Sequence, residues 1–230
     1  MQNIKSVVTD EVQAGRELVA YIGRMLFDRH LTDACGGNVS LRVGDVYCMS
    51  PTLAGHMRQW QLDADDVLVV NREREIIAGD GKLTRETAVH FGLHENYGEY
   101  GTAVIHCHPK NLMVFTCMNK AMPPIMEATR KFGVTPTIEY APAHSPKLGE
   151  RIVASMKGRE KRIVGHAAGT IAPWHGLFLM GKHLQAALDA VERLDTNAYV
   201  LMMSQHLGGS PMLAEESAQM EDAIANFTED

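Results

Sequence analysis

The 230-residue sequence predicts a layered α/β or α+β fold in a single domain that spans residues 1–230. Two observations favour this class. Segments with the period of an amphipathic helix share the chain with strand-like segments, and most of the strand-like segments form hairpins rather than alternating strictly with helices. A third observation is that no repeat, low-complexity tract or linker divides the sequence. With 45% hydrophobic residues, the chain can bury a complete core.

The first half of the chain predicts two helices and two hairpins. In order, the expected elements are a helix over 10–30, strands NVSLRV and VYCMS, strands within DDVLVVN and EIIAGD, and a helix over 84–97. The dipeptide Gly44-Asp45 predicts a tight turn in the first hairpin. We expect Thr9 or Asp10 to cap the first helix and Thr84 the second, because their side-chain oxygens can accept a free N–H of the first turn.

The second half of the chain predicts strands and helices around one buried strand. The expected elements are a strand over 102–107, a helix over about 110–119, a strand in TPTIEYAP, a helix over 146–157, one or two short strands in TIAPWHGLFLMG and a helix over 182–206. We expect the strand over 102–107 to lie inside the sheet. Gly208-Gly209 should end the last long helix, and a short acidic helix should close the chain.

Charge and composition exclude several classes of partner. Lysine and arginine number 22 against 28 acidic residues, and the formal net charge of −6 disfavours nucleic acid and anionic membranes. The N-terminus MQNIKSVVTDEV lacks the pattern of a signal peptide, and no apolar run approaches the ~20 residues of a membrane span. The four cysteines form no C-x-x-C pair and should be free thiols. We therefore expect a cytoplasmic protein.

The segment AVIHCHPKNL carries the clearest chemical signal in the chain. His106 and His108 end a buried strand, and Pro109 prevents the strand from continuing. Because alternate side chains of a strand share a face, the two imidazoles should point the same way and Cys107 the opposite way. Two neutral imidazoles that converge at a strand end predict part of a metal site.

A third histidine would complete such a site. The candidates are His175 in PWHGLF, His166, His144, and the helical pair His90 and His94. His175 is favoured because it lies between a Pro-Trp turn and a glycine at the start of an apolar strand. The i, i+4 pair could bind zinc, but a packed helix face explains it more simply. Three imidazoles leave one position of a tetrahedral ion open, which is typical of catalytic sites.

Acidic and small polar residues lie upstream of this strand. Glu86 begins the preceding helix, and a helix N-terminus favours the anionic form of a possible acid/base. The turns GGNVS, SPTLAG and GKLTRE offer backbone N–H groups and hydroxyls, which together could cradle an anion. Each of them alone is an ordinary turn. Their combination upstream of the histidines favours a phosphorylated ligand.

Five motifs in order resemble those of the class II aldolase/adducin family: GGNVS, SPTLAG, KLTRE, VIHCHP and WHGLFLMG. With these motifs in order and at this spacing, the resemblance extends from the first helix to about residue 206. The family includes fuculose phosphate aldolase, ribulose phosphate 4-epimerase and methylthioribulose phosphate dehydratase. The resemblance implies a three-layer α/β/α fold with a central, largely antiparallel sheet.

The resemblance also implies a set of site residues. His106, His108 and His175 would bind a divalent metal, with Glu86 as the acidic residue beside it. The positions that match the phosphate-binding residues of the aldolases are Gly37, Asn38, Ser50, Gly55 and Thr84. Three imidazoles favour zinc, although manganese, cobalt or iron would also bind. The family further implies a small phosphorylated sugar as substrate and a homotetramer with active sites at subunit interfaces.

The sequence departs from the family at two places. Where members often carry two serines before the acidic residue, this chain has Thr84-Arg85, which keeps one hydroxyl and adds a guanidinium that favours phosphate. Where fuculose aldolase has a tyrosine after the metal-binding strand, MPPIMEATRKFG places Glu127. Fuculose aldolase also uses a second tyrosine near its C-terminus. This sequence has no counterpart to it, because no tyrosine follows Tyr199. Glu127 is therefore a second candidate acid/base.

The favoured reaction is metal-dependent retro-aldol cleavage of a ketose 1-phosphate to dihydroxyacetone phosphate and an aldehyde. Methionines and prolines in MPPIMEATRKFG favour an apolar tail, as in 5-deoxyribulose or 5-methylthioribulose 1-phosphate, although core packing also explains them and fuculose 1-phosphate is a further candidate. The same metal site would serve a dehydratase or a 4-epimerase. An amidohydrolase-type enzyme is disfavoured because its H-x-H motif stands near the start of a long barrel. An adducin-like binding module is disfavoured because it would be expected to lose the histidines.

Overall fold

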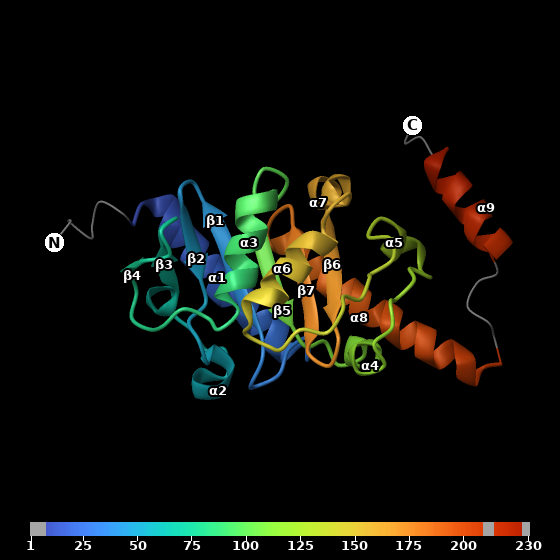
Figure 1. The fold of residues 1–230 in the computed structure, drawn as a ribbon, viewed down its shortest axis with the longest axis horizontal. Helices are drawn as coiled ribbons and strands as arrows, with labels where there is room; N and C mark the ends of the chain where they lie inside the picture. Colours follow the sequence, from blue (N-terminus) through green and yellow to red (C-terminus); the bar gives the residue numbers. More distant parts are fainter. Residues whose placement is uncertain (1–7, 209–213, 227–230) are drawn as a thin grey trace.

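One sheet with helices on both faces forms the centre of the computed structural model, which describes residues 8–208 and 214–226 (Figure 1). The strands are β1 (Asn38–Val43), β2 (Val46–Met49), β3 (Leu68–Val70), β4 (Ile76–Ala78), β5 (Ala103–Cys107), β6 (Ala167–Ala172) and β7 (Gly176–Gly181). Their order is β4-β3-β2-β1-β5-β7-β6, and each pairing between described strands is antiparallel. The predicted largely antiparallel sheet is confirmed, and β5 lies inside it.

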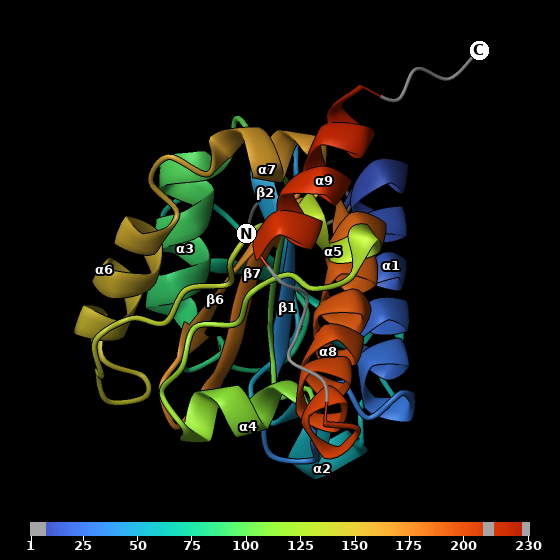
Figure 2. The same ribbon diagram turned by 90° about the vertical axis from the view of Figure 1, so that its right-hand side faces the viewer.

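Helices cover both faces of this sheet, which confirms the predicted three layers (Figure 2). One face packs against α1 (Asp10–Asp28) and α8 (Leu184–His206), and the other against α3 (Thr87–Tyr97) and α6 (Pro146–Ser155). The shorter helices are α2 (Ala54–Arg58), the 3-10 helix η2 (Ala64–Asp66), α4 (Leu112–Cys117), α5 (Glu127–Arg130), α7 (Glu160–Gly165) and α9 (Ala214–Ala225). Within the described ranges, none of these helices combines the length and hydrophobicity that crossing a bilayer requires.

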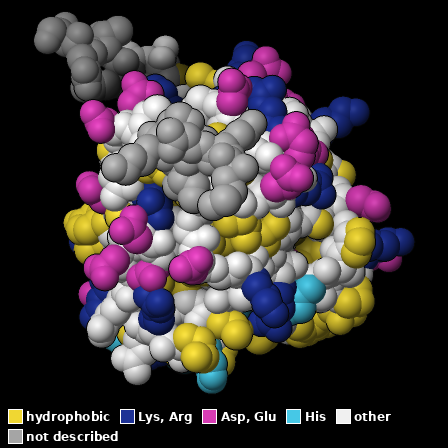
Figure 3. Space-filling view, turned by 90° about the vertical axis from the view of Figure 1, so that its left-hand side faces the viewer, with side chains coloured by type: hydrophobic (Ala, Val, Ile, Leu, Met, Phe, Trp, Pro, Cys, Tyr) yellow, Lys and Arg dark blue, Asp and Glu magenta, His cyan; other side chains and the backbone are white. Residues whose placement is uncertain are grey.

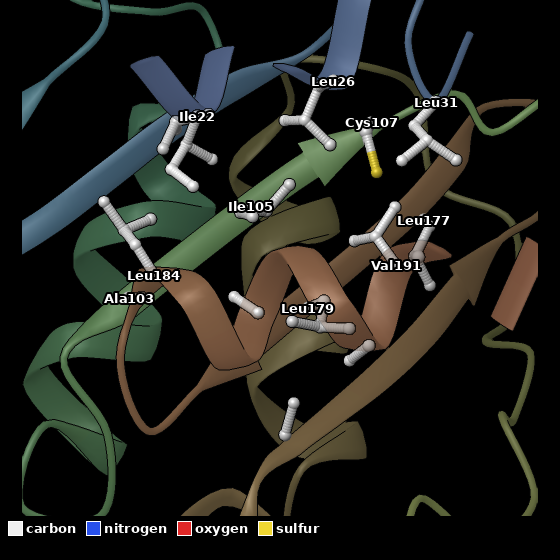
Figure 4. Close-up of a cluster of buried hydrophobic side chains, with 14 of the residues drawn as sticks. Ile22, Leu26, Leu31, Ala103, Ile105, Cys107, Leu177, Leu179, Leu184 and Val191 are labelled. Atoms are coloured by element: carbon white, nitrogen blue, oxygen red, sulfur yellow. The ribbon is translucent and has the colours of Figure 1, made fainter. Parts of the chain in front are cut away.

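The interior strand β5 lies between two hydrophobic clusters, one on each face of the sheet. Ile105 and Cys107 point toward α1 and α8 and belong to the larger cluster (Figure 4). Val104 belongs to the cluster on the opposite face, with residues of α3 and α6. His106 is next in the alternation and stacks on Phe178 of the neighbouring strand, with ring centroids 4.0 Å apart and ring planes 9° from parallel. The period of the strand therefore places the first histidine on the α3 face, away from the larger core.

The two predicted helix caps have different outcomes. Thr9 Oγ1 accepts a hydrogen bond from the Val12 N–H at 3.3 Å, so Thr9 is the cap of α1. The prediction that Thr84 caps the next long helix is wrong, because α3 begins at Thr87 with Glu86 as its N-cap. Thr84 Oγ1 instead accepts the Glu86 N–H at 3.3 Å in a turn that precedes the helix. That extra turn carries Glu86 to the helix terminus.

The predicted strand in TPTIEYAP is wrong. The segment makes only isolated bridges, from Thr135 to Met122 and from Thr137 to Ile171. Pro136 lacks the N–H group that a continuous ladder needs, so pairing does not extend beyond these bridges. The short helices α2, α5 and α7 have no counterpart among the predicted elements, because one or two turns of helix leave no readable period.

The β4 edge of the sheet carries charges of both signs. The turn Arg72–Glu75 directly precedes β4, where Arg72 contacts Asp45 at 2.6 Å and Arg74 contacts Glu95 at 3.0 Å. Figure 3 shows basic and acidic side chains interspersed on this side of the molecule. Charged residues beside an edge strand disfavour its pairing with another chain.

Replacement of Gly23 by alanine should destabilise the fold. An added Cβ would lie 2.4 and 2.6 Å from Cε3 and Cζ3 of Trp60, whose side chain is completely buried. Overpacking of this kind costs about 1–3 kcal/mol, which outweighs the gain of up to about 1 kcal/mol from replacing a helical glycine. We expect a lower free energy of unfolding in urea.

The matched control for this substitution is Gly165→Ala in α7, where an added Cβ meets nothing within 4 Å. This variant should unfold at the same urea concentration as the parent or at a slightly higher one. If Gly23→Ala were as stable as Gly165→Ala, the contact between α1 and Trp60 would be looser than the structure indicates.

Candidate active site

A cleft of about 170 Å³ opens at the carboxyl end of β5. Its walls come from six parts of the chain: the turn before β1, the segment that leads into α2, the turn before α3, the end of β5, the loop before α6 and the β6–β7 turn. In the register of the sheet, Asn38 lies opposite His106 on β1, and Phe178 lies opposite it on β7. The antiparallel pairing thus brings distant parts of the sequence together around the first histidine.

The three histidines favoured as metal ligands converge in this cleft. One ring nitrogen from each of His106, His108 and His175 lies within 4.8 Å of the others. The Nδ1–H of His106 donates to the Leu177 carbonyl oxygen at 2.9 Å. Since a carbonyl only accepts, Nε2 keeps its lone pair. Burial and the neighbouring histidines hold the pKa of His106 well below its ordinary value, so its ring is neutral.

His108 is oriented by an aspartate from the loop that follows α1. Its Nδ1 lies 2.9 Å from Asp33 Oδ2, while Asp33 Oδ1 accepts the N–H groups of Cys35 at 2.8 Å and Gly36 at 2.6 Å. Burial raises the pKa of Asp33, but these hydrogen bonds outweigh it and leave the pKa below its usual value. The ionised carboxylate therefore accepts the Nδ1 proton. Nε2 of His108 is buried and has no hydrogen-bond partner in the described structure.

His175 occupies the β6–β7 turn, directly after Trp174, whose φ is +57°. Burial and the nearby His108 and His144 lower the pKa of His175 to about 4, so this ring is also neutral. Its Nδ1 is buried without a hydrogen-bond partner among the described residues. Three imidazoles with unused nitrogen atoms, two of them oriented by hydrogen bonds, fit a divalent metal.

Glu86 stands beside the histidines, as expected. Its carboxyl group is almost completely buried, and Oε1 lies 2.9 Å from His144 Nδ1 and 3.5 Å from His175 Nε2. Burial raises the pKa of Glu86, and the charges of His144 and Arg85 oppose this effect. His144, which the sequence suggested only as a possible ligand, is thus the partner of Glu86. No local pattern could have indicated this pairing, because the two residues belong to different loops.

The predicted phosphate-binding residues divide into two groups. Five of them line the cleft: Gly37, Asn38, Gly55, Thr84 and Arg85. Gly37 has φ +88°, and a Cβ there would lie 2.5 Å from Thr32 Oγ1, so only glycine fits. Ser50 does not reach the cleft. It is fully buried, and its hydroxyl accepts the Val39 N–H at 3.0 Å, so the structure corrects its expected position to a support behind β1.

Glu127 does not reach the cleft of its own chain. It is exposed at the start of α5 and lines a separate groove together with Arg130, Lys131 and Arg193. Asn197 on α8 holds the preceding backbone, since its Oδ1 accepts the Ile125 N–H at 2.9 Å. A role for Glu127 in the reaction therefore remains a prediction that needs a second subunit.

The helical pair His90 and His94 is part of the packing and not of the metal cluster. Nδ1 of His90 lies 2.7 Å and Nε2 of His94 lies 2.8 Å from the hydroxyl of Ser40, and Nε2 of His90 lies 2.5 Å from Asn38 Oδ1. Burial lowers the pKa of each imidazole to about 3. Both rings are therefore neutral, and the simpler of the two interpretations of this pair is supported.

These two buried imidazoles should make the protein unstable in acid. They titrate near 6.5 in the unfolded chain but at about 3 in the folded protein, so below about pH 6.5 only the unfolded state binds their protons. The free energy of unfolding should therefore fall as pH falls, by up to about 1.4 kcal/mol per pH unit for each histidine. In urea titrations between pH 7 and 5, the free energy of unfolding of His94→Gln should fall less steeply than that of the parent. The control His206→Gln, which changes an exposed residue, should lose as much as the parent. If His94→Gln lost as much stability as the parent over this pH range, the lowered pKa of His94 would be contradicted.

Comparison with known proteins agrees with this arrangement. The family model of the class II aldolase and adducin N-terminal domain matches residues 17–202, so the chain belongs to the class II aldolase and adducin family. The 3-oxo-tetronate 4-phosphate decarboxylase of Pectobacterium atrosepticum is 26% identical over 202 residues, which are 85% of this chain and 87% of that one. The 5-deoxy-D-ribulose 1-phosphate aldolase of Bacillus thuringiensis is 22% identical over 213 residues, which are 92% and 93% of the two chains.

Solved structures show the same fold. An L-fuculose 1-phosphate aldolase superposes with a TM-score of 0.78 at 18% identity, covering 95% of this chain and 98% of that one. A sugar-phosphate aldolase from Thermotoga maritima superposes with a TM-score of 0.72 at 22% identity, covering 87% and 98%. The predicted family and fold are confirmed, and membership supports the prediction of an enzyme of the class II aldolase type. Decarboxylases among the relatives were not expected from the sequence.

Proposed function

We propose that this protein cleaves a ketose 1-phosphate by a metal-dependent retro-aldol reaction, giving dihydroxyacetone phosphate and an aldehyde. The observation that carries the proposal is the cluster of His106, His108 and His175 beside the buried carboxyl group of Glu86. An open metal site next to a carboxyl group of raised pKa is suited to breaking a carbon–carbon bond beside a carbonyl. The favoured substrates are 5-deoxyribulose and 5-methylthioribulose 1-phosphate, with fuculose 1-phosphate as a further candidate.

The polar turns of the cleft would bind the phosphate. Gly37 allows the backbone to come close to a ligand, and Asn38 and Thr84 supply an amide and a hydroxyl. Arg85 adds a guanidinium, whose planar set of donors matches phosphate oxygens. Together these groups would hold the phosphate end of the substrate and direct its carbonyl end toward the histidines.

The three histidines would hold one divalent ion, for which zinc is favoured and manganese, cobalt or iron also suit the imidazoles. When bound, the ion supplies Lewis-acid polarisation of substrate oxygens. Asp33 and the Leu177 carbonyl keep two of the rings in the tautomer that leaves Nε2 free. The protein thereby holds its ligands in place before an ion arrives.

Glu86 would transfer protons at the reacting carbon atoms. Its raised pKa brings the protonated and ionised forms closer in population near neutral pH, which suits a group that must both accept and donate. His144 would orient the carboxyl group through its Nδ1. Glu127 would act as the second acid/base only in a homotetramer whose active sites lie at subunit interfaces, with α5 of one subunit over the cleft of its neighbour.

Decarboxylation of a 3-oxo-tetronate 4-phosphate is the second candidate function. The observation that favours it is the identity of 26% to enzymes with that name in Pectobacterium atrosepticum and Haemophilus influenzae. Loss of carbon dioxide from a 3-oxo acid also leaves negative charge next to a carbonyl, so the same site would serve. A dehydratase or a 4-epimerase would use the same residues.

Product analysis distinguishes these functions. The metal-loaded protein is incubated with 5-deoxyribulose, 5-methylthioribulose, fuculose and rhamnulose 1-phosphates and with 3-oxo-tetronate 4-phosphate, beside a His106→Ala control. Dihydroxyacetone phosphate from the first two at the highest rate supports the proposal. Faster turnover of fuculose or rhamnulose 1-phosphate overturns the substrate preference. Carbon dioxide, or a dehydrated or epimerised phosphate, overturns the aldolase in favour of the corresponding alternative.

A further inference from the structure

A chain of buried polar side chains runs from the cleft into the α3 face of the sheet. Asn38 lines the cleft, and its Oδ1 lies 2.5 Å from His90 Nε2. His90 Nδ1 lies 2.7 Å from Ser40 Oγ, which lies 2.8 Å from His94 Nε2. Ser40 and His90 are completely buried, and Asn38 and His94 nearly so. The metal cluster does not include these side chains, so their arrangement needs another explanation.

The chain of hydrogen bonds has only two possible directions. Ser40 carries one proton, so it donates to one imidazole and accepts from the other. In the first direction, His94 Nε2–H donates to Ser40, Ser40 donates to His90 Nδ1, and His90 Nε2–H donates to Asn38 Oδ1. In the reverse direction donor and acceptor exchange in each of these hydrogen bonds. Asn38 must then turn its NH2 group toward His90. The two directions therefore present opposite ends of the Asn38 amide to the cleft.

Arg42 selects the first direction. His94 Nδ1 is buried without a hydrogen-bond partner among the described residues, and the reverse direction would place an unpaired N–H there. Arg42 lines the same surface hollow as His94, and its positive charge adds to the effects of burial and of His90, which lower the pKa of that imidazole. A positive charge favours a lone pair over an N–H at the end of the chain. An unpaired buried N–H would also cost more than an unpaired, weakly solvated lone pair.

We propose that His90 is a positioning residue for substrate binding, which holds the Asn38 amide with its NH2 group facing the cleft as a donor to the phosphate of the substrate. Because Asn38 pairs with His106 in the register of the sheet, the same constraint sets the distance between the phosphate donor and the histidine cluster. The inference rests on the proposed function only in taking the ligand to be a phosphate. Both imidazoles are neutral and act through hydrogen bonds, so no buried charge competes with the ligand.

Two substitutions at residue 90 separate positioning from packing. His90→Leu fills the position with an apolar side chain of moderate size and removes the donor to Asn38. His90→Gln places an amide N–H near the position of Nε2 and should restore the donor in part. We expect His90→Leu to bind inorganic phosphate about 10- to 100-fold more weakly in calorimetry. A hydrogen bond to a charged group contributes about this much to an affinity. His90→Gln should recover part of this loss, and His206→Gln should match the parent.

On the substrate identified by product analysis, the loss should fall on KM more than on kcat, with zinc content unchanged. A structural role alone would lower zinc content and thermal stability in all variants without rescue by glutamine. If His90→Leu does not fold, Ser40→Ala breaks the chain one step further away and should weaken phosphate binding in the same way. Unchanged phosphate affinity in whichever of these variants folds overturns the proposal. Inactivity on every sugar phosphate, with phosphate binding still dependent on His90, contradicts only the proposed function.

The direction of the chain has its own measurement. In protein labelled with ¹⁵N-histidine, both His90 and His94 should appear as neutral Nε2–H tautomers at pH 7, with the two signals assigned from His90→Gln and His94→Gln. Nδ1–H tautomers for the pair would show the reverse direction and overturn the proposed orientation of Asn38.

Discussion

His106→Ala should abolish metal binding and lower activity by at least about a thousandfold, since Lewis-acid stabilisation is worth several kcal/mol. His106 is the central member of the cluster, because its ring lies 5.0 Å from that of His108 and 4.7 Å from that of His175. The remaining two imidazoles cannot complete a catalytic site of three protein ligands. The measurement is zinc content by mass spectrometry, together with turnover on the substrate identified by product analysis.

Two further variants make this result specific. His106→Gln keeps a side chain over Phe178, so it should lose the metal with less loss of stability than the alanine variant. His206→Ala changes an exposed histidine at the end of α8 and should keep both zinc and activity. Removal of the metal from the parent with a chelator should reproduce the His106→Ala phenotype, and added zinc should reverse it in the parent alone. Full zinc content in His106→Ala would contradict the proposed site.

Glu86→Gln should lower kcat by about a hundred- to ten-thousandfold while zinc remains bound. The amide is nearly isosteric and can still contact His144, but it cannot accept or donate a proton in the reaction. Glu86 is buried beside the histidines but is not itself a proposed metal ligand, so metal content separates its role from theirs. The measurement is single-turnover kinetics beside zinc analysis.

The matched control lies on the same helix. Glu95→Gln changes an exposed carboxylate of α3 that contacts Arg74 at 3.0 Å, and it should leave kcat unchanged. An exposed pair of this kind contributes little to stability. If Glu86→Gln retained normal turnover, the proton would have to be carried by another group, and Glu127 from a neighbouring subunit would become the first candidate.

Local pattern was sufficient to predict much of this protein. The alternation around Cys107 put His106 on one face of β5, and the structure confirms it. Thr9 as a cap, the hairpin at Gly44 and the long α8 also follow from residues that are neighbours in the chain. In each case a period, a turn residue or a side-chain oxygen acts within a few residues, so the sequence contains the whole interaction.

The tertiary structure decided which distant residues meet. Asp33 orients His108 from 75 residues away, and His90 contacts Asn38 from 52 residues away. The placement of Ser50 behind β1 and of Glu127 outside the cleft depends on sheet register and on the packing of α5 against α8. These contacts follow from long-range pairing, which no local propensity encodes. The amino-acid sequence by itself determined the kinds of chemical group available, and only the fold determined which of them share the cleft.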